Sequence, residues 1–405
     1  MFKKIVKLFS LLKKNILVYI TPSYHDYFKK NIFSNDDNKK IVLFVDRCIP
    51  MYDKDAGSKT VFQYINLFLN NGYRVLFIGD DFIKHEPYTS YLCNIGVEVL
   101  YGKYFYINWR SWIEEFGKYI NIAILNRPYI AEKYINTLRN IENIKVLYFG
   151  HDLHHIREER EFKITNDYRT RESSKKHEKL EFEIIEKVHS SYWFSKKEVD
   201  IIKSKNKKIN AKTIPLNIYS NIPKRLFSFE NCSDLLFVGG FLHKPNIDAM
   251  IWFCTDIMPL VTKSHPEIKL QIVGSNITKE IKRLESENVI IKGYVADEEL
   301  KEIYCTSRIC VVPLRFGAGV KGKVIEAMYY QLPVITTSIG AEGIVDAENI
   351  LEIKDNPVEF ADEIIDLHYN IDKLVKKSSK SYKYMCNYFN EESALKVFRE
   401  DGIIK

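Results

Sequence analysis

The sequence predicts an α/β protein built from two doubly wound parallel sheets. Short apolar runs alternate with amphipathic stretches along most of the chain, which is the pattern of repeated strand and helix units. The 405 residues exceed what one hydrophobic core usually supports, so two domains are favoured. A polar stretch bounded by prolines, residues 215–223, separates the two series and indicates an interdomain hinge. We therefore expect domains at 41–222 and 223–405, preceded by a separate segment at 1–40.

The N-terminal segment has an amphipathic, basic character. Within residues 1–20 apolar side chains recur every three or four positions, and the first fourteen residues hold five lysines and no acidic residue. This pattern predicts a helix, but it lacks the small-residue cleavage site of a secretory signal. The helix should either bind an anionic membrane surface or dock on the protein's own surface. Residues 21–40 are predicted to be a polar linker.

The first domain should begin with a buried strand at 41–45, followed by a loop and a helix that Ser58 caps. The other predicted strands are 74–78, 97–100, 122–125, 145–149 and 191–194, and the predicted helices are 58–70, 111–119, 131–139, 156–187 and one capped by Ser195. The charged helix 156–187 should be long, with a solvated face. Ligands of such a sheet lie beyond the carboxyl ends of its strands, which selects the loops at 53–58 and 150–155.

The second domain should repeat the arrangement. Its predicted strands are 234–238, 269–273, 289–292, 309–313, 333–337 and 350–353, and its predicted helices are 246–258, 278–284, 297–305, 323–330, 357–374 and 376–398. Gly239 and Gly240 follow the first of these strands. Glycines at that turn either let the backbone approach a ligand or serve the turn alone.

The strongest functional signal lies at 315–344, around a glycine-rich loop. Gly317, Gly319 and Gly322 allow the backbone to come close to a ligand, directly before a helix that begins at Lys323. The free N–H groups and the positive dipole end of such a helix can hold an anion.

Cations gather at the same helix end. Arg315, Lys321 and Lys323 are unfavourable for the helix itself, so a negative ligand is expected there, and a diphosphate fits best. Glu326 lies in the first turn, where its carboxylate can reach the hydroxyls of a ribose or can simply complement the helix dipole.

Several of these segments resemble a known family. FVGGFLHKPNIDA at 237–249, IVGS at 272–275, GYVAD at 293–297 and RFGAGVKGKVIEAM with TTSIGAEGI at 315–344 are together similar to the C-terminal half of bacterial family-4 retaining glycosyltransferases of the GT-B fold. DAGSK at 55–59 and HDLHHIREERE at 151–161 resemble loops of the N-terminal half more weakly. The resemblance implies two Rossmann-like domains facing across a cleft, with the last helix crossing back to the first domain.

The function that the resemblance implies is transfer of a hexosyl group, with retention, from a nucleotide sugar on the second domain to a glycan or lipid-linked acceptor on the first. It implies bacterial surface polysaccharide synthesis by a cytoplasmic protein, peripheral at the inner face of the membrane. His154 matches a histidine that contacts the donor sugar, with His151 and Asp152 as close candidates. Lys321 would bind the diphosphate and Glu326 the ribose, and these two complete the catalytic set with His154. The expected donor-binding residues are Gly57, Gly239, Gly240, Tyr294, Arg315, Gly317, Gly319, Val320, Lys321, Lys323 and Glu326.

Two positions depart from the family pattern. Ala318 stands where the first of two glutamates eight positions apart is widespread, and Gly240 stands where many members carry an arginine. Alternative functions are therefore a GT-B sugar-nucleotide epimerase and a catalytically silent, glycosyltransferase-like subunit that positions a partner.

Metal, nucleic acid and membrane-spanning functions are disfavoured by composition. Asp53 and Asp55 spell a D-x-D pair, but two aspartates in a polar loop are common by chance, and the histidines of 151–155 are expected to be hydrogen-bonded rather than metal-bound. No cofactor is expected. The net charge of +7 lies largely at the N-terminus, which argues against a nucleic-acid-binding face. Seven scattered cysteines suit a reducing compartment, and no apolar run reaches the ~18 to 20 residues that a spanning helix needs.

Overall fold

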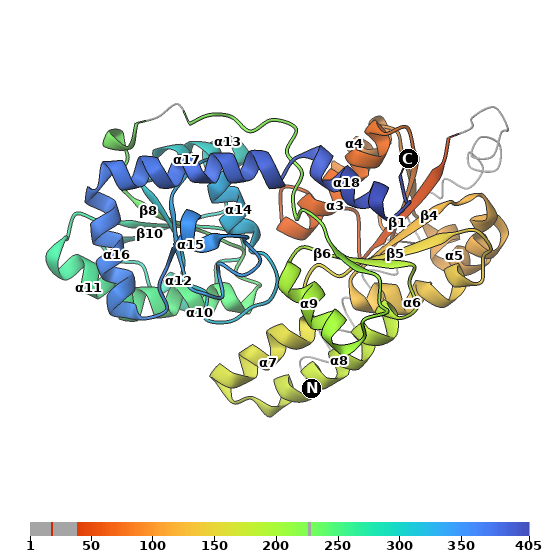
Figure 1. Ribbon diagram of the computed structural model, residues 1–405, viewed down its shortest axis with the longest axis horizontal. Coiled ribbons are helices and arrows are strands. Elements are labelled where there is room, and N and C mark those ends of the chain that lie inside the picture. The colour runs from red at the N-terminus through yellow and green to blue at the C-terminus, as the bar shows by residue number, and fades with distance from the viewer. Residues whose placement is uncertain (1–17, 19–38, 226–227, 405) are drawn as a thin grey trace.

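The computed structural model describes residues 18, 39–225 and 228–404, which form two α/β domains (Figure 1). Within these residues the first domain has a seven-stranded sheet with the order β3-β2-β1-β4-β5-β6-β7, and the second has a six-stranded sheet with the order β10-β9-β8-β11-β12-β13. Neighbouring strands of both sheets run parallel. The predicted pair of doubly wound sheets is confirmed.

Apart from the edge strand β7, the first-domain strands consist mostly of buried residues, as expected where helices cover both faces of a parallel sheet. They are β1 (Ile41–Asp46), β2 (Arg74–Gly79), β3 (Val97–Leu100), β4 (Ile122–Asn126), β5 (Lys145–Phe149), β6 (Ser190–Trp193) and β7 (Ala211–Thr213). The helices are α3 (Ala56–Asn70), α4 (Tyr88–Asn94), α5 (Lys103–Phe116), α6 (Pro128–Arg139), α7 (His154–Thr165), α8 (Tyr168–Ile185) and α9 (Lys196–Lys205).

The prediction of a single helix at 156–187 was wrong. Asn166 adopts a left-handed conformation, with φ of 53°, and ends α7, while the Asp167 side chain accepts a hydrogen bond from the Arg169 N–H and begins α8. The two helices pack against each other as a hairpin (Figure 1). Other predicted limits were also wrong, since α5 begins at Lys103 rather than at 111, and α3 is capped by Asp55 rather than Ser58. The short elements α4 and β7 were not predicted.

The second domain follows the predicted series of strands. They are β8 (Leu235–Val238), β9 (Leu270–Val273), β10 (Val289–Gly293), β11 (Ile309–Val312), β12 (Val334–Thr336) and β13 (Glu352–Ile353). Its helices are α10 (Lys244–Trp252), α11 (Met258–Ser264), α12 (Lys279–Lys282), α13 (Asp297–Thr306), α14 (Gly322–Tyr329), α15 (Ala347–Ile350), α16 (Pro357–Tyr369), α17 (Ile371–Tyr388) and α18 (Glu391–Glu400). The predicted helix 246–258 is interrupted by a π-helical turn, Phe253–Ile257, and the predicted helices 357–374 and 376–398 are three helices.

The end of the chain packs on the first domain, where α18 lies beside it (Figure 1). The ring of Phe398 is fully buried and contacts four aromatic rings of the first domain. These rings belong to Tyr64, Phe68, Phe149 and Tyr192. Asp401 forms an ion pair of 3.0 Å with Lys212 and accepts a hydrogen bond from Tyr192. These contacts fasten the two domains together.

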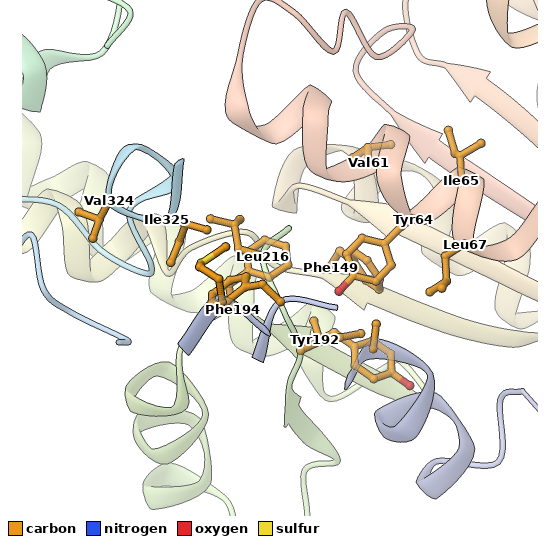
Figure 2. Packing of buried hydrophobic residues seen from close by; sticks show 14 of the residues in the cluster. Val61, Tyr64, Ile65, Leu67, Phe149, Tyr192, Phe194, Leu216, Val324 and Ile325 are labelled. Carbon is orange, nitrogen blue, oxygen red and sulfur yellow. The ribbon is translucent and has the colours of Figure 1, made fainter. Parts of the chain in front are cut away.

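A continuous hydrophobic cluster also joins the domains. Figure 2 shows part of this cluster, which extends from α3 and β5 through Phe194 and Leu216 to Val324 and Ile325 of α14. The first turn of α3 meets the first turn of α14, because a Cβ atom on Gly322 would lie 3.1 Å from the Cβ atom of Ala56. The N-termini of α3 and α14 are therefore in contact.

The predicted N-terminal helix at 1–20 and the linker at 21–40 fall almost entirely outside the described residues. Val18 is described, and its side chain is buried in a core cluster of the first domain. Among the described residues, no helix has the length and apolar character needed to cross a membrane.

Candidate active site at the domain interface

The glycine-rich loop after β11 places two lysines at the start of α14. Gly317 and Gly319 have φ of 146° and 67°, where a side chain would be strained, so this path requires glycine. Lys321 is the N-cap residue of α14, and its buried ammonium donates to the carbonyl oxygens of Ala318, at 3.1 Å, and Gly319. Burial lowers the pKa of Lys321 to about 8, against the opposing effect of Glu342.

Lys323 lies against the turn that follows β8. Its ammonium donates to Oδ1 of Asn246, whose amide donates to the carbonyl oxygen of Gly240 at 2.8 Å. A Cβ atom on Gly239 would lie 2.7 Å from Nζ of Lys323, so a side chain at this position would displace the ammonium. Burial lowers the pKa of Lys323 to about 7. The structure thus groups Lys323, Gly239 and Gly240 together, next to the N-terminus of α14.

The other second-domain candidates, Glu326 and Tyr294, contact lysines of the first domain. The Lys59 ammonium lies 2.8 Å from Oε1 of Glu326, and the Tyr304 hydroxyl lies 3.3 Å from Oε2. Lys54 donates to the Tyr294 hydroxyl at 2.7 Å, and this bond raises the pKa of Lys54. The first turn of α3 and the loop before it therefore cover the side of α14 where Glu326 lies.

The loop at 150–155 brings its histidines and Asp152 to the carboxyl ends of β4 and β5. His151 has a left-handed φ of 61° and its Nε2 lies 3.1 Å from Oδ1 of Asn126. Burial and then Arg127 lower the pKa of His151 to about 3, so the ring is neutral near pH 7. Gly57 adjoins this ring, because a Cβ atom there would lie 3.7 Å from Nδ1 of His151.

His154, at the start of α7, lies beside Asp152. Its Nε2 is 3.3 Å from Oδ1 of Asp152, and Arg157 donates to the other carboxylate oxygen. Burial alone would raise the pKa of Asp152, but Arg157 and His154 hold it far below its usual range. His243 of the second domain lies in the same environment. Its partial desolvation, with Arg157 and Lys323 nearby, lowers the pKa of His243 to about 4.

The glycine-rich loop touches the first domain directly. A Cβ atom on Gly319 would lie 3.3 Å from Cβ of Asp152 and 3.4 Å from both carboxylate oxygens of Glu198. Glu198 is buried, and its Oε1 accepts a hydrogen bond from the Leu153 N–H at 2.8 Å. Its Oε2 has no hydrogen-bond partner among the described residues. Burial raises the pKa of Glu198 to about 8, and nearby Asp152 adds to the shift.

Two of the predicted site residues, Arg315 and Val320, make side-chain contacts away from Lys321 and Lys323. Arg315, expected beside Lys321 and Lys323, instead pairs with Asp248 of α10, with Nε 2.9 Å from Oδ2. Val320 packs against the second loop, since a Cβ atom on Gly343 would lie 2.5 Å from its Cγ2.

Sequence reasoning missed several residues that the structure places at the interface. Arg160 of α7 donates to the carbonyl oxygen of Gly317 and pairs with Glu342, at 2.5 and 3.2 Å. Arg157, Glu198, His243 and Lys59 were also missed. The prediction that the charges of 156–187 form a solvated face was wrong for the arginines of α7. A usable signal was their spacing, because Arg157 and Arg160 lie three positions apart and are neighbours on the helix surface.

Neither aspartate of the D-x-D pair is free. Asp53 accepts a hydrogen bond from the Tyr88 hydroxyl at 2.6 Å, and Asp55 caps α3 and pairs with Arg47 at 3.1 Å. Across the described ranges, no group of three or more His, Cys, Asp or Glu side chains is arranged to hold a metal ion.

Comparison with known proteins shows likeness to glycosyltransferases. Residues 232–370 match the model of a family described as glycosyl transferases group 1. An uncharacterized 44.6 kDa protein in the cps region of Klebsiella pneumoniae is 32% identical over 184 residues, covering 43% of this chain and 47% of that protein. A 41.2 kDa protein of the same description is 24% identical over 192 residues, covering 42% and 51%. The chain spans about half the length of these curated relatives.

Solved structures with a similar fold cover most of the chain. Sucrose-phosphate synthase from Thermosynechococcus elongatus has a TM-score of 0.67 at 16% identity, over 89% of this chain and 98% of that one. Anabaena Alr3699/HepE, solved with UDP and glucose, has a TM-score of 0.66 at 13% identity over the same shares. A mutant of S. aureus TarM, solved with Fondaparinux, alpha-GlcNAc-glycerol and UDP, has a TM-score of 0.57 at 18% identity, over 72% and 57%. These likenesses confirm the predicted GT-B fold.

Proposed function

We propose that this chain is a glycosyltransferase that moves a hexosyl group from a nucleotide sugar to a glycan or lipid-linked acceptor with retention. The family match over 232–370, the GT-B fold and the UDP complexes of two structural neighbours support this function. The cps-region descriptions of two relatives support a role in bacterial surface polysaccharide synthesis. We place the protein in the cytoplasm, at the inner face of the membrane, where a lipid-linked acceptor would be found.

The observation that carries the proposal is the pair of lysines at the start of α14. Lys321 is the N-cap residue of α14 and Lys323 lies in its first turn, and burial lowers the pKa of both ammonium groups. A lysine is poorly stabilised in such surroundings unless an anion is near, and a helix N-terminus favours the same anion. A nucleoside diphosphate satisfies all these groups at once, while Glu326 offers a carboxylate to the ribose.

This reaction requires electrostatic stabilisation of the leaving diphosphate rather than a covalent nucleophile. The bond between the anomeric carbon and the diphosphate oxygen breaks, and the acceptor oxygen forms a bond to the same carbon. The departing phosphate takes the proton of the acceptor hydroxyl, so charge balances without a protein base. Lys321 and the α14 N-terminus would stabilise the growing phosphate charge, and His154, oriented by Asp152, would contact the transferred sugar.

We propose further that no metal is needed. The lysines supply the positive charge that a divalent ion provides elsewhere, and Asp53 and Asp55 already bind Tyr88 and Arg47.

Release of nucleoside diphosphate, measured with and without an acceptor, distinguishes this function from its alternatives. A glycosyltransferase releases nucleoside diphosphate only when an acceptor is present, and a hydrolysing epimerase releases it without one. A silent partner subunit releases none, and Ala318 and Gly240 are the positions that favour it. Screening nucleotide sugars by thermal shift selects the donor, because a ligand at a hundredfold its dissociation constant stabilises by ~2.7 kcal/mol.

Two substitutions test the assignment of the diphosphate and ribose contacts. Lys321→Ala should lower kcat about a hundredfold, because this charge acts most strongly on the transition state. Glu326→Gln should mainly raise KM, because a ribose contact is the same before and during the reaction. Lys282→Ala, at an exposed position on α12, is the control for loss of a lysine.

The ion pair between Lys59 and Glu326 requires a second control. If Lys59→Ala raised KM as much as Glu326→Gln, the effect would come from the domain contact rather than the ribose. Wild-type kinetics in both Lys321→Ala and Glu326→Gln would show that the loop is structural and that the site lies elsewhere.

A further inference from the structure

Four aromatic rings gather on the first domain, at the edge of the domain interface. Tyr52 precedes α3, Phe62 lies on α3, and Tyr88 and Tyr91 lie on α4. The ring centroid of Tyr52 is 4.5 Å from that of Phe62, 5.5 Å from that of Tyr88 and 5.7 Å from that of Tyr91. Phe62 and Tyr91 are 5.9 Å apart. We call these four residues the aromatic platform.

The aromatic platform packs against the core and exposes the ring of Tyr91 to solvent. Tyr88 is buried, Tyr52 and Phe62 are half-buried against the main core cluster, and Tyr91 is 44% exposed. The Tyr88 hydroxyl donates to Oδ1 of Asp53 at 2.6 Å, which ties α4 to the loop before α3. An open ring surface on a fixed base is suited to binding, because little side-chain freedom is lost when a ligand packs on it.

Two opposite charges border the aromatic platform on the side of the second domain. The Lys54 ammonium lies 3.2 Å from Oδ2 of Asp53, and it also lies 4.2 Å from the ring centroid of Tyr294. Burial would raise the pKa of Asp53, but its bonds to Tyr88 and Lys54 lower it, so the carboxylate is charged at neutral pH. The platform is thus continuous with the contact that reaches the candidate donor residue Tyr294.

We propose that the aromatic platform binds a pyranose ring of the acceptor glycan. One face of a pyranose ring carries C–H groups and packs on an aromatic ring, while its hydroxyls need paired donors and acceptors. Tyr52, Phe62 and Tyr91 provide the apolar surface. Asp53 and Lys54 are bonded to Tyr88, Tyr294 and each other, but a carboxylate oxygen has a second lone pair and an ammonium a third N–H, so both can also bond a sugar hydroxyl. The inference rests on the proposed function, whose acceptor it describes.

Other occupants fit this surface less well. The charges of Asp53 and Lys54 cancel, so the patch attracts neither a nucleic acid backbone nor an anionic membrane selectively. A lipid chain would leave both charges in contact with hydrocarbon, which is unfavourable. A neutral sugar ring can pack its C–H face on the aromatic rings and place its hydroxyls near the two charged groups.

The experiment measures binding of the full chain to an array of bacterial surface oligosaccharides immobilised through their reducing ends. Tyr91→Leu should weaken binding to the recognised oligosaccharides at least tenfold, since leucine keeps apolar area but removes the ring face, whereas Tyr91→Trp should retain binding. Tyr388→Leu is the matched control, because Tyr388 is also 44% exposed and contacts another ring, but lies on α17.

A second measurement separates this inference from the proposed function. UDP binding, followed by thermal shift, should be equal in the wild type and the three variants, because none changes a residue at the N-terminus of α14. Failure of the wild type to bind UDP or any other nucleoside diphosphate would count against the proposed function alone. The inference is overturned if the wild type binds no oligosaccharide, or if Tyr91→Leu binds as tightly as Tyr388→Leu.

Discussion

The pH dependence of nucleotide binding tests the role assigned to Lys323. Burial lowers the pKa of this lysine to about 7, so near neutral pH about half of the free protein carries the charge that a diphosphate needs. A bound diphosphate stabilises the protonated ammonium and raises its pKa. Binding is therefore strongest below pH 7 and weakens as the pH rises toward the pKa of the complex.

The lowered pKa of Lys323 sets the size of the effect. With a pKa of about 7 in the free protein, the protonated fraction of Lys323 falls from about one half at pH 7 to about one hundredth at pH 9, so proton linkage predicts that this lysine alone raises Kd by up to about fiftyfold over that range. Folding responds with the opposite sign. The unfolded chain keeps the proton up to about pH 10.5, while the folded chain releases it near pH 7, so the ligand-free fold gains stability from Lys323 as the pH rises across that window.

Isothermal titration with the nucleoside diphosphate that binds tightest among UDP, ADP, GDP and dTDP provides the measurement. The terminal phosphate of these ligands has a pKa of about 6, so its remaining ionisation above pH 7 is small and would strengthen binding, which is opposite to the predicted weakening. Lys323→Arg should bind with a clearly shallower pH profile, because a guanidinium stays protonated and only Lys321, whose pKa is about 8, still loses its charge in this range. Lys323→Met should bind weakly at every pH. A wild-type Kd that changed by less than about threefold, or an arginine variant with the wild-type slope, would refute the role of Lys323.

Three further predictions concern the rest of the chain. Phe398→Ala should destabilise the fold by about 3 to 5 kcal/mol in calorimetry, because its ring is fully buried among first-domain aromatics, and a smaller loss than in Tyr388→Ala would contradict that packing. Excess chelator should leave turnover unchanged, whereas a loss restored by magnesium or manganese would make Asp53 and Asp55 ligands. Deletion of residues 1–20 should abolish co-sedimentation with anionic vesicles at low salt, since each lysine near such a surface contributes about 1 kcal/mol, and unaltered co-sedimentation would exclude this membrane role.

The strands could be predicted because a parallel sheet that is covered on both faces leaves apolar runs in the sequence. Every residue of β1 and β11 is buried, and both runs were recognised. The break between α7 and α8 was missed because charge-rich helices carry little apolar periodicity. The local signal was the pair Asn166 and Asp167. Asn166 ends α7 in the left-handed conformation and Asp167 is the N-cap of α8, so turn chemistry rather than burial determines the break.

The site was predictable only where it depends on local spacing. Lys321, Lys323 and Glu326 lie on or next to one helix end, so the glycine pattern around them locates that end. Their partners come from distant parts of the chain. Lys59 is 267 residues from Glu326, and Arg160 is 182 residues from Glu342. Such pairs depend on how two domains meet, which no sequence spacing records.

Two cross-domain ion pairs near the site, Lys59 with Glu326 and Arg160 with Glu342, differ in the free energy needed to separate them. The side chains of Lys59 and Glu326 are 35% and 22% exposed, so water replaces much of their interaction, and an exposed pair contributes only about 0 to 1 kcal/mol. Arg160 and Glu342 are 19% and 3% exposed, and separating them without a replacement partner leaves a buried carboxylate uncompensated, which costs several-fold more. Opening the interface on the side of Lys59 is therefore cheaper than opening it on the side of Arg160. If Glu326 binds the ribose as proposed, the nucleotide would enter where the protein's own pair is weaker, and it would replace one partner of a carboxylate that is already accessible to water.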